Sequence, residues 1–467
     1  MVFSSVTFLC LFLPIFLIAY FISKNITFKN IVLVAFSLVF YAWGEPVWVL
    51  ALLTSGLTDY FCGCAIEKSA QSGKTGAGKK IALAVSLIIN LGILTTFKYS
   101  GFIIENINAA ARVNLPVPRF NLPLGISFYT FQTMSYTIDT YRGKIKAQKS
   151  LLSFLCYVTM FPQLVAGPIV RYSDIEGDLT DRKMTRERLS AGITRFAIGL
   201  VKKTLLANPA GAAATALLAD ASRLTTASAW LGIALFIFQV YFDFSGYSDM
   251  AIGIGKMIGF DFLENFNYPL ESSSVTDFWR RWHISLGSFF RDYVYIPLGG
   301  NKKNQVRNIA IVWLLTGFWH GASWNYIFWG LYQGVFLMLE RYALRGALAK
   351  APSLIRRIYA IPVVLFGFGL FYFTSIPDLG MFIKAMFHIG VPLTSFLPGT
   401  VLANNFWLII ILVVASTSWP KKAVSYLSEI FPGVVHLTEP IFTVACTLAS
   451  FVMLLGQTYN PFLYFRF

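Results

Sequence analysis

Long apolar stretches are the feature that most limits what this chain can fold into. Several of them approach the ~20 apolar residues that a helix needs to span a bilayer. Only 13% of the 467 residues are charged, whereas a soluble domain has about a quarter. Because a helix satisfies its own backbone hydrogen bonds inside lipid, the sequence predicts an all-α polytopic membrane protein. The clearest apolar stretches are residues 2–22, 31–43, 47–66, 81–102, 230–250, 358–373, 406–414 and 441–455.

The polar segments between these stretches are short, so the sequence predicts a single membrane domain over residues 1–467. We expect N-terminal helices in residues 1–141, a core with the candidate functional residues at roughly residues 122–345 and C-terminal helices in residues 358–458. The five cysteines lie mostly inside apolar stretches, where a thiol behaves as a small hydrophobic group. They predict neither a disulfide framework nor a metal site.

The net charge of +16 is spread over the loops, as the positive-inside rule predicts for a membrane protein. We therefore expect no nucleic-acid partner. If the basic loops near Lys24 and at residues 68–80 are both cytoplasmic, two spans fit between them and the N-terminus lies outside. The segment at residues 151–170 has basic residues on both sides and is interrupted by proline and glycine, which favours a re-entrant hairpin.

Polar residues interrupt one apolar stretch in "QVYFDFSGYSDMAIG". Asp243, Ser245 and Asp249 lie there near Gly246, and the pattern indicates a local break in the helix close to an interface. Ionisable groups inside a span are costly and often functional. The alternative that these carboxylates cap a helix or pair with an arginine stays equally open.

A second stretch, "TDFWRRWHISLGSFFRDYVYIPLGG", combines cationic and aromatic residues. Arg280, Trp282 and His283 belong to it, and apolar residues recur at helical spacing without a charge-free run of 20. This pattern is typical of an amphipathic helix at the membrane interface, with its basic face towards headgroups or phosphate. His283 in that case is either a functional residue or part of an anchor.

The third site is His320, one of only four histidines. Basic residues flank residues 308–340 on both sides, so the segment predicts a membrane hairpin with His320 and Gly321 at its apex. The apex lies roughly 18 Å from the start of the first arm. Trp319 and other aromatic residues surround the imidazole, and burial disfavours its charged form. A neutral histidine can accept a proton from a hydroxyl, so we expect a general base. His388 and His436 lie in poorly patterned segments and are expected to be incidental.

Two of these stretches carry a family resemblance. "FWRRWHISLGSFFRDYVYIPLGGNK" and "GFWHGASWNYIFWGLYQG" resemble the membrane-bound O-acyltransferase superfamily, and more narrowly its bacterial branch that acetylates alginate and peptidoglycan. The resemblance spans nearly the whole chain. It implies a funnel of roughly ten or more transmembrane helices, with re-entrant and interfacial segments. By the same resemblance His320 is catalytic and His283 is a second functional residue. The residues expected to line the tunnel are Asp243, Ser245, Asp249, Trp282, Trp319 and Arg280.

The resemblance also implies a reaction. Acetyl-CoA is the expected cytoplasmic donor, with no permanently bound cofactor and no metal, and a polysaccharide is the expected acceptor. A separate extracytoplasmic partner of the SGNH-hydrolase type is expected to complete the transfer, in the cytoplasmic membrane of a bacterium. D-alanyl transfer to teichoic acid from a carrier-protein thioester is the alternative. A glycan or lipid transporter is less favoured, because transporters usually show inverted repeats and none is visible here.

Overall fold

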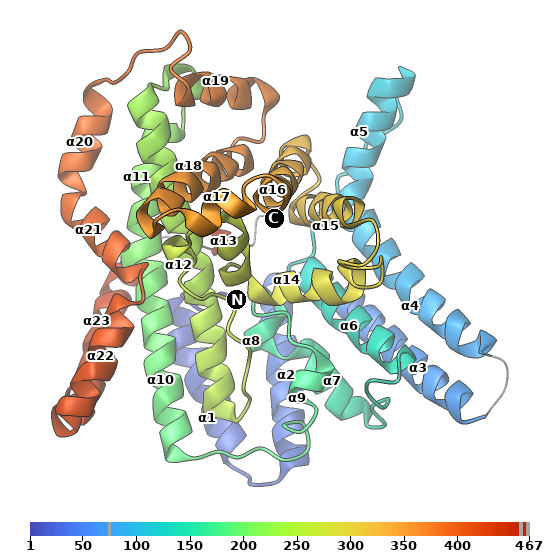
Figure 1. The fold of residues 1–467 in the computed structure, drawn as a ribbon. Helices are drawn as coiled ribbons and strands as arrows, with labels where there is room; N and C mark the ends of the chain where they lie inside the picture. The colour runs from blue at the N-terminus through green and yellow to red at the C-terminus, as the bar shows by residue number, and fades with distance from the viewer. Residues whose placement is uncertain (73–75, 457–460, 464–467) are drawn as a thin grey trace. The chain divides into compact units, whose positions relative to one another are not determined.

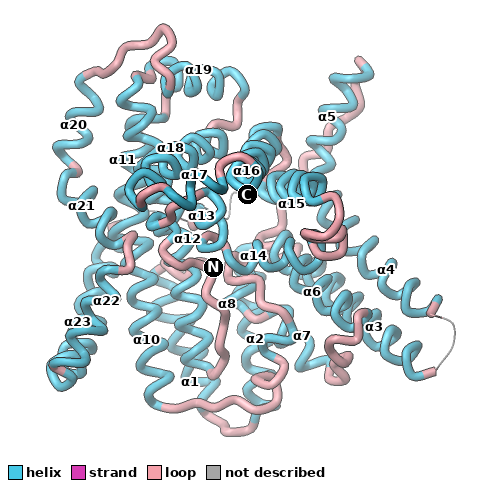
Figure 2. Tube along the Cα trace, viewed as in Figure 1, coloured by secondary structure: helices cyan, strands magenta, loops and turns pink. Residues whose placement is uncertain are grey.

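The computed structural model describes residues 1–72, 76–456 and 461–463. In this part of the chain, helices are joined by loops and no strand occurs (Figure 2). Large apolar side chains lie exposed on many of the helices, including Phe396, Trp407 and Trp419. Such exposure is unfavourable in water but expected where lipid tails surround the helices. The prediction of an all-α polytopic membrane protein is confirmed.

Within the described residues, six helical segments are long and apolar enough to cross a bilayer. A bent pair, Phe396–Asn404 and Phe406–Ala415, meets at 67° and raises the number to seven if it forms one span. The remaining helices are shorter or more polar, so the expected number of ten or more crossings stays a prediction. The six segments are Ile26–Gly44, Val49–Gln71, Ala77–Ala111, Thr226–Ile258, Ser353–Tyr372 and Pro432–Leu455.

The chain divides into two compact units. Among the described residues, the first comprises residues 1–72, 76–196, 247–263 and 461–463. The helices that begin in this unit are η1 (Phe8–Phe12), α1 (Leu13–Phe21), α2 (Ile26–Gly44), α3 (Val49–Gln71), α4 (Ala77–Leu94), η2 (Thr95–Tyr99), α5 (Ser100–Ala111), α6 (Ile126–Tyr141), α7 (Leu151–Thr159), α8 (Phe161–Leu164), α9 (Tyr172–Ile175) and α10 (Arg186–Val201).

In this first unit, α3, α4 and α6 pack against one another (Figure 1), and the carboxylate of Asp59 is buried among them. Asp59 of α3 accepts hydrogen bonds from Ser86 Oγ, from Asn90 Nδ2 at 2.9 Å and from Thr137 Oγ1 at 3.0 Å. Hydrogen bonds of this kind join helices where lipid supplies no hydrophobic driving force. They explain why polar residues occur on these apolar helices.

The second unit comprises Ala197–Gly246 and Glu264–Gly456. Its helix α16 packs against α15, α13 and α18. The helices that begin in this unit are η3 (Lys202–Ala207), α11 (Asn208–Leu218), η4 (Ala221–Arg223), α12 (Thr226–Ile258), η5 (Pro269–Glu271), α13 (Val275–Arg281), α14 (Ile284–Phe290), η6 (Arg291–Tyr295), α15 (Gln305–His320), α16 (Trp324–Tyr342), α17 (Arg345–Lys350), α18 (Ser353–Tyr372), α19 (Ile376–Met386), α20 (Phe396–Asn404), α21 (Phe406–Ala415), α22 (Trp419–Ile430) and α23 (Pro432–Leu455).

The break expected near Gly246 is absent, because α12 runs without interruption from Thr226 to Ile258. A Cβ atom on Gly246 would lie 2.8 Å from the carbonyl oxygen of Gly199. In the first unit, a Cβ atom on Gly253 would lie 2.7 Å from the carbonyl oxygen of Gly192. These glycines let α10 and α12 approach closely, and that is why they occur in a continuous helix.

The segment at residues 151–170 is broken and buried, as its sequence indicates. The helix α7 ends at Thr159, the short α8 begins at Phe161, and residues 160–170 are all buried. No candidate span among the described residues includes it. Its re-entrant path through the membrane stays a prediction.

Candidate active site

The helices α15 and α16 form the hairpin that the sequence predicts around His320 (Figure 1). A Cβ atom on Gly317 would lie 2.3 Å from the carbonyl oxygen of Tyr326. Likewise, a Cβ atom on Gly330 would lie 2.3 Å from the carbonyl oxygen of Trp313. Any side chain at either position would therefore push the two backbones apart. Since His320 is the last residue of α15, this contact fixes the position of the imidazole.

Gly321 is needed at the turn because of the side chain beside it, and its backbone conformation does not require glycine. Its φ of −174° is extended backbone, which any residue can adopt. A Cβ atom at this position would, however, lie 2.2 Å from Cε2 of Tyr326. The glycine thus makes room for the Tyr326 ring, which packs directly beneath the turn.

His320 is 4% exposed and lies among aromatic rings. Its ring centroid is 4.9 Å from that of Trp319, 4.9 Å from that of Trp329 and 5.3 Å from that of Phe371. All three rings meet the imidazole edge-to-face, at 76° to 89°. Trp324, four residues further along the chain, is exposed. His320 is therefore largely removed from solvent and lies between aromatic rings, as expected for a desolvated base.

His283 lies at a break that the sequence analysis did not foresee. Instead of one amphipathic helix at the membrane surface, α13 ends at Arg281 and α14 begins at Ile284. Between them His283 adopts the left-handed conformation, with φ of 47°. Its side chain is only 3% exposed, so an exposed interfacial anchor is excluded for this residue.

The imidazole of His283 contacts an aromatic ring on each of two helices. Its centroid lies 4.8 Å from that of Phe244 and 5.8 Å from that of Trp319. Its Nδ1 atom lies 3.2 Å from Oδ1 of Asn265. Because His283 is outside the long apolar spans yet desolvated, burial lowers its pKa to about 3. The ring is consequently neutral at physiological pH.

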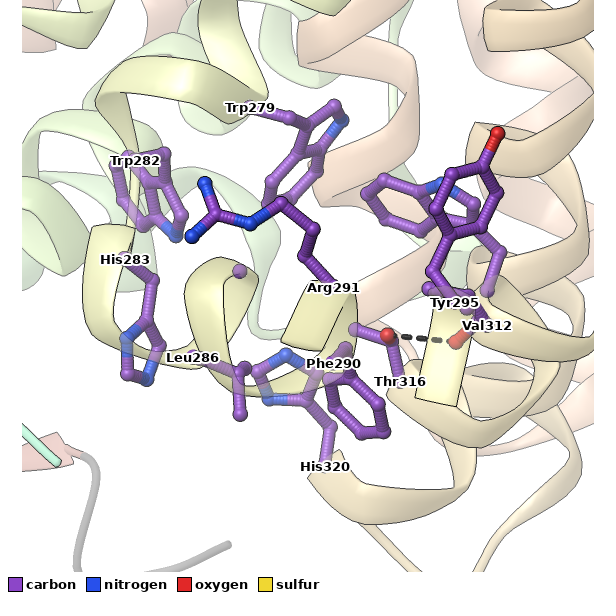
Figure 3. Close-up of a pocket in the computed structure, with 12 residues that line it drawn as sticks. Trp279, Trp282, His283, Leu286, Phe290, Arg291, Tyr295, Val312, Thr316 and His320 are labelled. Atoms are coloured by element: carbon purple, nitrogen blue, oxygen red, sulfur yellow. Dashed lines mark hydrogen bonds between the residues drawn. The ribbon is translucent and has the colours of Figure 1, made fainter. Parts of the chain in front are cut away.

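Both histidines line one cavity of ≈ 190 Å³ (Figure 3). Its volume is far above the ~10–15 Å³ needed to hold a single water. The walls come from α13, α14, η6 and α15, all within the second unit. The lining residues are Trp279, Trp282, His283, Leu286, Gly287, Phe290, Arg291, Tyr295, Val312, Trp313, Thr316 and His320.

The cavity has a cationic wall as well as its imidazoles. Arg291 is held by two hydrogen bonds to the carboxylate of Asp292, at 2.7 and 3.1 Å. In Figure 3 its side chain extends towards Trp279 and Trp282 and away from His320. Trp279 is fixed in turn by donating from Nε1 to Gln333 at 3.1 Å. The cavity thus combines a guanidinium, paired with Asp292, and two buried imidazoles, and burial keeps that of His283 neutral.

Of the residues expected to line a tunnel, two are at this cavity. Trp282 lines it, and the Trp319 ring lies between the rings of His283 and His320. Arg280 does not line the cavity and is exposed. The cation at the cavity wall is Arg291, one residue beyond α14.

The polar residues of α12 lie elsewhere. Asp243 accepts a hydrogen bond from Lys203 Nζ at 2.6 Å, and Ser245 is buried. Asp249, in the first unit, accepts a hydrogen bond from Arg195 Nε at 2.8 Å. The sequence left open whether these carboxylates serve a functional site or pair with a cation, and each of them has a cationic partner. Their role in a tunnel stays a prediction.

Asn265 and Arg291 are the site residues that sequence reasoning missed. Arg291 gave a signal, since an Arg-Asp pair directly follows an apolar helix. Asn265 gave none, because it reaches His283 from a loop 18 residues earlier in the chain. Only the folded chain brings Asn265 and His283 together.

Among the residues that the structure describes, no cluster of three or more His, Cys, Asp or Glu side chains could hold a metal ion. The expectation of a metal-free site stays a prediction. All five cysteines are free thiols. The chemistry that the cavity supports with its own residues is proton transfer and charge stabilisation.

Comparison with known proteins places this cavity inside a family domain. Residues 121–382 match the model of the MBOAT, membrane-bound O-acyltransferase, family. Every lining residue of the cavity falls within that match.

Several relatives resemble the chain over most or part of its length. A protein named probable alginate O-acetylase AlgI, of Azotobacter vinelandii, is 36% identical, with 100% of both chains covered. A peptidoglycan O-acetyltransferase of Helicobacter pylori is 35% identical over 73% of this chain and 70% of its own. A teichoic acid D-alanyltransferase of Bacillus subtilis is 32% identical over 46% of this chain and 58% of its own.

Proposed function

The chain belongs to the membrane-bound O-acyltransferase family, and from that premise we propose that it supplies acetyl groups from cytoplasmic acetyl-CoA for O-acetylation of an extracytoplasmic polysaccharide. Family membership makes it an O-acyltransferase, and its apolar helices make it a multi-pass membrane protein. The finer assignment is supported by the full-length similarity to a protein named as an alginate O-acetylase. The observation that carries it is the cavity shared by His320 and His283.

The arrangement around His320 supports general-base catalysis. In the proposed step, the neutral imidazole accepts the proton of an acceptor hydroxyl as its oxygen attacks the carbonyl carbon of the thioester. The new C–O bond forms, the C–S bond breaks, and the proton passes from His320 to the departing CoA thiolate. General-base assistance accelerates such reactions about 10²–10⁴-fold. The aromatic walls keep water out, which protects the thioester from hydrolysis.

The proposal includes a partner and a location. The described residues form two units of apolar helices, and a polysaccharide needs a hydrophilic groove. We therefore assign the last transfer to a separate extracytoplasmic protein of the SGNH-hydrolase type. The proposed location is the cytoplasmic membrane of a bacterium, and the relatives named above are bacterial.

The test is transfer by purified, membrane-reconstituted full-length protein supplied with radiolabelled acetyl-CoA and the polysaccharide-acetylating partner. We expect His320→Ala to lower the rate at least about 10²-fold. His436→Ala is the matched control, because His436 is exposed on α23, and it should retain the wild-type rate. Wild-type turnover by His320→Ala would refute the role of His320.

A second donor in the same assay separates the family's branches. D-alanyl transfer is the alternative, and the D-alanyltransferase similarity covers under half of this chain. Acetyl-CoA should be consumed, and a D-alanyl carrier-protein thioester should not. The opposite result would place the chain in the D-alanylating branch.

A further inference from the structure

The loop residue Asn265 is fully buried and holds the turn that carries His283. Its side-chain oxygen accepts from the backbone N–H of Ser285 at 3.1 Å and from Ser285 Oγ at 2.9 Å. The same oxygen lies 3.2 Å from Nδ1 of His283. Its backbone carbonyl accepts from the N–H of Ile284 at 2.9 Å. One residue thus contacts the ring of His283 and the first two residues of α14.

The hydrogen bond from Ser285 determines which atom of the Asn265 amide faces His283. A backbone N–H can only donate, so the atom that it meets must be the amide oxygen. An amide oxygen carries no hydrogen, so Nδ1 of His283 must be the donor across the 3.2 Å contact. In a neutral imidazole only one nitrogen carries the proton, and the lone pair is then on Nε2.

From this geometry we propose that Asn265 is a positioning residue, which fixes His283 as the Nδ1–H tautomer and so makes Nε2 a hydrogen-bond acceptor at the catalytic cavity. The tautomer follows from contacts alone, whereas its catalytic consequence rests on the proposed acyl transfer. While neutral, His283 cannot donate from Nε2 to an oxyanion. It accepts instead, from a hydroxyl or an amide N–H of a bound reactant.

The backbone of His283 supports a positioning role. A positive φ is uncommon outside glycine, although Asn, Asp and His adopt it more often than other residues do, and it persists where the surroundings determine the conformation. The bonds from Ser285 and Ile284 to Asn265 supply that constraint. The turn places His283 in the cavity lining and prevents α13 from continuing into α14.

The direct test measures the tautomer by NMR. Full-length protein carrying nitrogen-15 histidine is placed in nanodiscs, and the His283 signals are assigned by their loss in His283→Gln. We expect the wild-type proton on Nδ1. Asn265→Asp should preserve it, because a carboxylate keeps the acceptor, and Nδ2 of Asn265 makes no hydrogen bond within the described residues. In Asn265→Leu, the imidazole of His283 should no longer be held in the Nδ1–H form.

The matched control is Asn267→Leu, the same change two residues along the loop at an exposed side chain. It should leave the His283 signals unchanged. A wild-type proton on Nε2 overturns the proposal even if no variant folds. So does a folded Asn265→Leu protein whose His283 keeps the wild-type tautomer.

A kinetic measurement links the tautomer to the reaction. In acetyl transfer from acetyl-CoA, Asn265→Leu should lower kcat about 10²-fold with a smaller effect on KM. Asn265→Asp should recover most of the rate, and Asn267→Leu should match wild type. If the wild-type protein transfers no acetyl group, the proposed function fails while the NMR result still decides the role of Asn265. If His283 in Asn265→Leu is no longer held as the Nδ1–H tautomer and the variant keeps full activity, the tautomer has no role in catalysis.

Discussion

The ammonium of Lys203 lies 2.6 Å from a carboxylate oxygen of Asp243, and their side chains are only 3% and 4% exposed. The pair joins η3 to α12 within the second unit. Removing one member of a buried ion pair leaves the other charge without compensation, which costs far more than the net contribution of the intact pair. Losing one charge alone should therefore weaken the packing of these two helices.

Breaking this pair from one side should destabilise the protein. We expect Lys203→Met to lower the free energy of unfolding by about 3–5 kcal/mol, seen as a lower Tm in detergent. The double variant Lys203→Met, Asp243→Leu should recover much of the loss, because neither charge remains buried. The exposed pair of Arg223 and Asp220 provides the control, and Asp220→Asn should change Tm little. Equal stability of the single and double variants would contradict this account.

The glycines of the α15–α16 hairpin should tolerate no side chain. Gly317→Ala places a Cβ atom 2.3 Å from the carbonyl oxygen of Tyr326, so the helices must separate. We expect a loss of about 1–3 kcal/mol or more and a displaced His320, measured as a lower Tm and slower acyl transfer. Gly399→Ala, in the open on α20, should be neutral or slightly stabilising. Wild-type activity of Gly317→Ala would show that the hairpin adapts.

Some of this structure could be predicted from local pattern. Two Trp-His pairs, at residues 282–283 and 319–320, indicated the two histidines that line the cavity. Basic residues on both sides of an apolar stretch indicated the α15–α16 hairpin. Both features depend on residues close together in the chain. The helical nature of the chain follows from its apolar stretches in the same way.

The remaining features depend on contacts that a pattern does not contain. The spacing of apolar residues around His283 predicts one continuous helix that includes Arg280. Nothing in that spacing indicates that His283 adopts a left-handed conformation, with φ of 47°. The break redirects α14, leaves Arg280 exposed and brings Arg291 to the cavity. Similarly, Gly246 resembles a helix breaker until the carbonyl of Gly199 is seen beside it.

The protonation of His283 should make the protein less stable in acid. Its pKa falls from about 6.5 in the unfolded chain to about 3 when buried. Between these values the unfolded chain binds the proton and the folded one does not, so stability decreases as pH falls through this range. The other titratable groups at the cavity are His320, Arg291 and Tyr295.

From pH 7 to pH 4.5 this histidine alone should cost about 2–3 kcal/mol, measured as a fall in Tm. His283→Gln should remove that part of the pH dependence, while His436→Gln should not. An identical acid sensitivity in wild type and His283→Gln would show that other groups are responsible.

The two histidines should act as one catalytic unit. Both line the same cavity. The ring centroid of Trp319 lies 5.8 Å from that of His283 and 4.9 Å from that of His320. If His320 removes the proton while His283 holds a reactant in place, losing either one leaves the other with little to contribute. His320→Ala and His283→Ala should each lower kcat about 10²-fold or more, and the double variant should be only slightly slower than the slower single variant.

The measurement is kcat for acetyl transfer from acetyl-CoA with all three proteins at matched membrane expression. Rate losses that multiply in the double variant would mean that the histidines serve independent steps, and this reading of the cavity would then fail.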